Sequence, residues 1–198
     1  MTSFQTMTTT ELLSEVKQIT ENNISALRLR FSALSAEQKN WRKDANSWSI
    51  SEIFAHLNSY AAYYHHAFIR KIEKTRFREP KENFISSPLG RSAWKSMKLG
   101  NMNNIRRKMK TQRTYNPLFD PSLVNGEDIH TFEKGLEELL RIIENSKQIN
   151  IRKAKIPISI SKIIRLRLGD ALLFVVYHNE RHMQQAFNVL EHPKFPTN

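Results

Sequence analysis

The stretch that decides the fold is LGDALLFVVYHNERHMQQAFNVL, residues 168–190. Its apolar residues recur with a period near 3.6, which predicts an amphipathic helix over about residues 168–190. Pro193 follows and is expected to stop this helix. His178 and His182 are four residues apart, so they project from the same side of the helix. That side is expected to face the core, because both histidines continue the apolar stripe.

A second helix is predicted from residue 49 or 50, where the signal for a helix start is clear. Ser49 and Glu52 have the spacing of a capping box, and Trp48 and Ile53 flank the cap as a hydrophobic staple requires. An apolar stripe with helical period then extends the predicted helix to about Lys74.

The same periodicity predicts two further helices. One covers about residues 9–34 and starts at a capping box formed by Thr8 and Glu11, and the other covers about residues 126–147. Four helices joined by long connections are typical of a four-helix bundle. We therefore expect an all-α fold and a single domain over residues 1–198.

The two longest connections differ in composition. Residues 77–121 contain repeated Pro and Gly and little apolar periodicity. This predicts a long crossover between the second and third helices, with one short helix near residues 102–110. Residues 151–163 are rich in β-branched side chains and are interrupted by Pro157, which predicts an extended or hairpin-like connector.

Composition limits the chemistry and the cellular compartment. The chain has no cysteine, which excludes disulfides, thiolate metal sites and cysteine nucleophiles. Any metal must therefore be bound by His, Asp, Glu or backbone oxygen. No stretch approaches about 18 uncharged apolar residues, and the first residues do not resemble a signal peptide. We expect a soluble cytoplasmic protein that does not enter a membrane.

The formal net charge of +12 makes nucleic acid a candidate partner. Much of this excess lies in residues 91–113, which hold eight basic residues and no acidic one. A nucleic-acid interface would use Arg106, Arg107 and Lys108 at its centre, and its affinity would fall steeply with salt. A solvated basic loop without a specific partner is the simpler interpretation.

Three histidines form the candidate metal site. His178 and His182 lie one helical turn apart, close enough for both imidazoles to reach one ion. Such a pair is a weak signal by itself, because two satisfied or solvent-edge histidines are the simpler interpretation. His56 is the candidate third ligand, since it lies on the flank of the apolar stripe of the second helix. The remaining histidines are left out of the site: His65, His66, His130 and His192.

SWSISEIFAHL (47–57) together with RLRLGDALLFVVYHNERHMQQ (165–185) resembles the DinB/YfiT-like superfamily. The matching positions on the two helices are Trp48, Ser49, Glu52, His56, Leu57, Asp170, His178, Arg181, His182 and Gln185. The resemblance implies a four-helix bundle in which three histidines bind a divalent metal, commonly nickel, zinc, iron or manganese, and leave an open coordination position.

The resemblance implies two reaction classes, metal-dependent hydrolysis and thiol transfer, each acting on an unidentified small molecule. A non-catalytic metal-binding protein and a nucleic-acid-binding bundle are the alternatives. No general base stands out, because capping is the simpler role for Glu52. Trp41, Trp48 and Tyr60 are candidates for the wall of a pocket beside the metal. A homodimer is expected from apolar residues on the helix surfaces.

Overall fold

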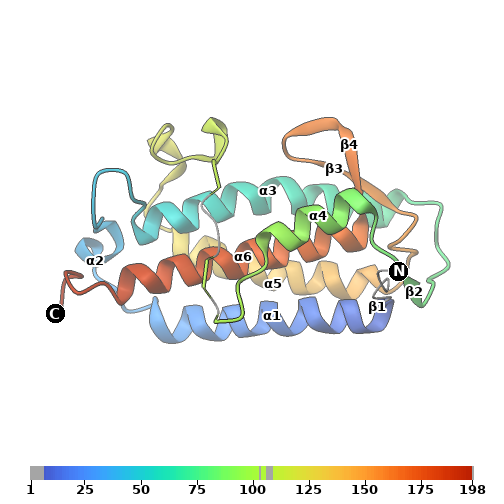
Figure 1. The fold of residues 1–198 in the computed structure, drawn as a ribbon, viewed down its shortest axis with the longest axis horizontal. Coiled ribbons are helices and arrows are strands. Elements are labelled where there is room, and N and C mark those ends of the chain that lie inside the picture. Colours follow the sequence, from blue (N-terminus) through green and yellow to red (C-terminus); the bar gives the residue numbers. More distant parts are fainter. Residues whose placement is uncertain (1–6, 103, 106–108, 198) are drawn as a thin grey trace.

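The computed structural model describes residues 7–102, 104–105 and 109–197. Its four long helices lie side by side along the molecule (Figure 1): α1 (Thr9–Arg30), α3 (Ile50–Lys74), α5 (Asp128–Ser146) and α6 (Leu168–Leu190). Shorter helical elements occupy the connections: α2 (Ala36–Asn40), α4 (Pro88–Met97), η1 (Arg113–Tyr115) and η2 (Pro121–Leu123). The described chain is therefore mostly helical, as the periodicity predicts.

Two small antiparallel sheets correct the expectation of a purely helical fold. Strand β1 (Met7–Thr8) pairs with β2 (Asn83–Phe84), which joins the start of α1 to the long crossover. Strand β3 (Lys155–Ile158) pairs with β4 (Ser161–Arg167), with an irregular register next to Pro157. The hairpin-like connector predicted before the last helix is thus confirmed.

The helix starts follow the predicted capping boxes. The Thr8 hydroxyl accepts the backbone N–H of Glu11 at 3.0 Å, and the Ser49 hydroxyl accepts that of Glu52 at 3.3 Å. The first helix ends at Arg30, earlier than predicted, because a further capping box at Ser35 begins the separate helix α2.

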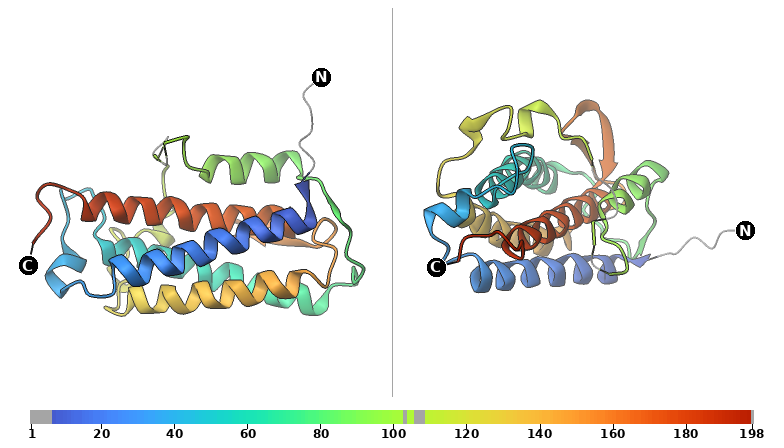
Figure 2. Two further views of the ribbon diagram at one scale, coloured as in Figure 1. Left: turned by 90° about the horizontal axis from the view of Figure 1, so that it is seen from below. Right: turned by 60° about the vertical axis from the view of Figure 1, so that its left-hand side comes forward.

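The short helix of the crossover lies earlier than predicted. It is α4, where Ser87 caps the first turn and Pro88 occupies the first helical position, and it packs along α6 (Figure 2). The described part of residues 102–110 is not helical, so the placement of a helix there is wrong. Arg106, Arg107 and Lys108, the centre of the suggested nucleic-acid interface, lie outside the described residues.

A buried carboxylate joins α4 to α6. Asp170, in the first turn of α6, is fully buried and accepts both the backbone N–H and the hydroxyl of Ser87 at 3.0 Å. The Ser87 hydroxyl in turn accepts the N–H of Gly90. A β-carbon on Gly90 would lie 2.1 Å from the Asp170 carboxylate, so only glycine allows this approach.

The apolar faces of the long helices form two neighbouring core clusters. One contains Leu12, Phe68, Leu139 and Leu172, and the other contains Phe31, Phe54, Phe132 and Met183. Both clusters draw residues from all four long helices, so each helix contributes to the interior along its length. Within the described ranges, no helix is both long and apolar enough to cross a membrane.

Candidate metal centre

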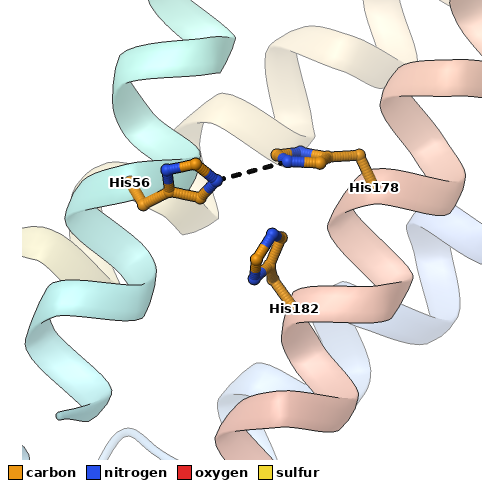
Figure 3. Close-up of side chains that lie close together, drawn as sticks. All are labelled: His56, His178 and His182. Atoms are coloured by element: carbon orange, nitrogen blue, oxygen red, sulfur yellow. Dashed lines mark hydrogen bonds between the residues drawn. The ribbon is translucent and has the colours of Figure 1, made fainter. Parts of the chain in front are cut away.

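Three histidines from α3 and α6 converge at the contact between these two helices (Figure 3). His56 lies in the second turn of α3, and His178 and His182 lie one turn apart on α6. One ring nitrogen from each lies within 4.8 Å of the others, so the three side chains could hold one metal ion. The Nε2 atoms of His56 and His178 are 3.3 Å apart. Two ligands of a tetrahedral ion are separated by about 3.4 Å, so this pair already has a suitable spacing.

The tautomer of His56 follows from its hydrogen bond. Its Nδ1 lies 2.6 Å from the backbone carbonyl oxygen of Tyr115, which only accepts, so Nδ1 carries the proton. In the neutral ring Nε2 then holds a lone pair directed at the cluster. The short contact between the two Nε2 atoms is a hydrogen bond donated by His178 (Figure 3). His56 is therefore oriented as a metal ligand would be.

His182 is oriented in the same way by a side chain on its own helix. Its Nδ1 lies 2.9 Å from Oε1 of Gln185, one turn further along α6. With the amide oxygen as acceptor, Nδ1 carries the proton and Nε2 is left with the lone pair. Two of the three imidazoles thus have an outer partner that fixes the ligating nitrogen.

Aromatic rings surround the cluster. The indole of Trp48 lies 4.8 Å from the ring of His56 and 5.9 Å from that of His182, and its N–H donates to Asn116. Tyr60 lies 4.5 Å from the ring of His178, between it and Tyr115. Phe174 also stacks on His178, with ring centroids 5.9 Å apart. These rings reduce access of water to the nitrogens, which strengthens electrostatic interactions within the site.

Burial keeps the three imidazoles neutral. Loss of hydration lowers the pKa of His56 from the usual 6.5 to about 4, although the hydrogen bond to Tyr115 opposes the shift. Burial also holds the pKa values of His178 and His182 well below the usual range, helped by the neighbouring imidazoles and the positive charge of Arg181. Because metals bind the neutral ring, burial favours ligation at neutral pH, and the Nε2 proton of His178 must move to Nδ1 before that nitrogen can bind an ion.

The lowered pKa of His56 predicts an acid-sensitive fold when no metal is bound. Between pH 6.5 and 4 the unfolded chain binds the proton and the folded chain does not, so the free energy of unfolding falls as pH falls. The expected loss approaches about 1.4 kcal/mol per pH unit for this histidine. Urea unfolding in the presence of a chelator measures it. The variant His56→Gln should show a shallower slope, and equal slopes in both proteins would contradict the prediction.

The other histidines lie outside the cluster. His130 is exposed on α5, and His192 lies beyond α6 against Trp41. His65 is half-buried beside α5, where loss of hydration lowers its pKa to about 4, and His66 is exposed on α3. Of the predicted pocket residues, Trp48 and Tyr60 flank the cluster. Trp41 instead packs against the C-terminal segment and does not wall the site.

Three contributors to the site were not assigned a role from sequence. They are the carbonyl of Tyr115, the side chain of Asn116 that holds Trp48, and the ring of Phe174. Tyr115 and Asn116 lie in the crossover, where no periodicity points to the site. The Tyr115-Asn116-Pro117 run also resembles the superfamily, and it is the signal from which this segment could have been found.

Fold and site together define a mostly helical protein with a buried three-histidine cluster between two long helices. A family model described as the DinB superfamily matches residues 19–186, which include all three histidines. The chain belongs to the DinB superfamily. No curated protein and no solved structure matches it.

Proposed function

We propose that this chain is a divalent-metal protein whose ligands are His56, His178 and His182, and that it acts as a metal-dependent hydrolase or thiol transferase. The observation that carries the proposal is the preset tautomer of the cluster. Two neutral imidazoles have their Nδ1 protons bound by outer acceptors, so their Nε2 lone pairs are available to one ion. Imidazole donors suit nickel, zinc and iron, and the resemblance to the superfamily adds manganese as a candidate.

Three protein ligands leave room for a further group in the coordination sphere. A bound divalent ion supplies Lewis acidity toward a water or a small thiol. The chain contributes the environment. Burial raises the pKa of Tyr60 to about 12, so its phenol stays protonated and can donate a hydrogen bond. Arg181 adds positive charge beside the histidines, which favours an anionic substrate group.

We also assign the packing of α1, α3, α5 and α6 to a DinB/YfiT-like four-helix bundle and treat residues 1–198 as one domain. The family match and the interior shared by the four helices support both assignments. In this arrangement the histidines bridge two bundle helices, so a bound ion would also stabilise the fold.

Elemental analysis of the purified untagged protein, followed by chelation and reloading, is the first test. We expect about one equivalent of a transition metal per chain and a rise in melting temperature on reloading. The loaded protein is then assayed for hydrolysis of activated esters and amides, and for transfer of low-molecular-weight thiols to electrophiles. Metal-dependent turnover in either assay supports the enzyme. Metal binding without turnover across both panels favours the non-catalytic alternative, and absence of binding would refute the metal site.

A further inference from the structure

The β3–β4 hairpin carries exposed apolar side chains that take no part in the histidine cluster. Ile160, Ile163 and Ile164 are 58%, 90% and 42% exposed, and the hairpin projects from the helices beside α3 (Figures 1 and 2). The buried face of the hairpin is instead anchored by Ile156 and Leu166. Exposed aliphatic residues gathered on one protruding hairpin indicate a contact surface, since they contribute nothing to the core.

Positive charge surrounds these isoleucines. The segment from residue 147 to 167 contains seven basic residues and no acidic one. Arg152, Lys153, Lys155 and Arg165 are exposed on the hairpin or just before it. The hairpin therefore has apolar side chains near its turn and positively charged side chains nearer the helices.

A groove of about 310 Å³ separates the hairpin from α3. Ile156, Pro157, Ala62 and Ala67 form apolar parts of its lining, and its basic and polar lining residues are Tyr63, His66, Arg70 and Lys71. The Tyr63 hydroxyl donates to the carbonyl of Ile158 at 3.0 Å, which fixes the hairpin against α3. Among the described residues that line the groove, none is acidic. An apolar floor with a cationic rim matches a ligand that has an anionic head and an aliphatic body.

We propose that the β3–β4 hairpin and this groove dock the protein onto an anionic lipid bilayer. The isoleucines at the tip enter the interface, while Lys155, Arg165 and Arg70 contact lipid phosphates. Nucleic acid fits less well, because exposed isoleucine side chains find no apolar partner along a phosphate backbone. A second copy of the chain fits less well too, since self-association through this face would bring like charges together.

The test is sedimentation of the full chain with vesicles of phosphatidylcholine and phosphatidylglycerol in equal amounts, compared with phosphatidylcholine alone. We expect binding to the anionic vesicles only, weakened by salt. The variant Lys155→Glu/Arg165→Glu should reduce vesicle partitioning by about tenfold or more. Its matched control, Lys43→Glu/Lys194→Glu, makes the same charge change at exposed positions near the other end of the molecule and should leave most binding intact.

The variant Ile160→Ser/Ile163→Ser tests the apolar part, with Leu29→Ser, 81% exposed on α1, as its control. The first should lower partitioning by several-fold, and the second should not. These side chains are exposed, so circular dichroism and melting temperature should match the parent protein. Equal losses in hairpin and control variants, or no binding to anionic vesicles, would overturn the proposal. Hairpin-dependent binding to duplex DNA without vesicle binding would overturn it in favour of nucleic acid.

Discussion

Replacement of His178 by alanine is expected to abolish tight metal binding. The rings of the three histidines contact one another pairwise, and the Nε2 of His178 is 3.3 Å from that of His56. Its loss leaves two imidazoles, which cannot enclose an ion against competition from water. We expect affinity to fall by well over about a hundredfold, beyond the range produced by changes to outer partners. Titration calorimetry of the chelated protein, with elemental analysis after purification, measures the loss.

Two further variants provide references for the size of this loss of metal affinity. Gln185→Leu removes the acceptor that orients His182 and keeps all three ligands, so a loss of about ten- to hundredfold is expected. His130→Ala changes an exposed histidine on α5 and should bind metal like the parent protein. Tight stoichiometric binding by the His178→Ala protein would show that the ion lies elsewhere.

Replacement of Gly90 by alanine is expected to cause the largest loss of stability. The added β-carbon would lie 2.1 Å from Oδ2 of Asp170, the oxygen that accepts both hydrogen bonds from Ser87. Asp170 is fully buried, so the carboxylate cannot turn to water when it is displaced. Steric strain and disrupted hydrogen bonds together should lower the free energy of unfolding by about 3–5 kcal/mol. Chemical denaturation monitored by circular dichroism tests this.

Gly135 provides the matched control, because it is also a glycine within a helix. A β-carbon there would lie 3.9 Å from its nearest neighbours, Ala61 and His65, which is ordinary van der Waals contact. Gly135→Ala should therefore stabilise the protein by about 0.5–1 kcal/mol through helix propensity. If both variants shifted stability equally, the approach of Gly90 to Asp170 would not be the cause.

The long helices could be predicted because their signals are local. Capping boxes at Thr8 and Ser49 placed two starts correctly, and apolar periodicity carried the predictions along each helix. Helix α4 was misplaced because it has only 10 residues, too few for the helical spacing of Leu89, Ala93 and Met97 to stand out. Its start is marked by Ser87 followed by Pro88, a short signal within a segment crowded with other prolines.

The candidate ligands could be proposed from sequence because spacing on a helix and the position of the apolar stripe place side chains on a face. The hydrogen-bond acceptors that orient these ligands were not equally predictable from sequence. Gln185 is one turn from His182 and was noted beside it, whereas Tyr115 reaches His56 across 59 positions. Contacts of that kind depend on the path of the crossover, which the sequence pattern alone does not determine.

Different kinds of mutation would remove the two hydrogen-bond acceptors that orient His182 and His56. His182 depends on an amide side chain, which a single codon change at residue 185 can delete. His56 depends on a main-chain oxygen at Tyr115, which every amino acid supplies. Drift at that codon leaves the acceptor in place, whereas an insertion or deletion in the segment would move it. The length of the crossover near Tyr115 should therefore be under stronger selection than the identity of its residues.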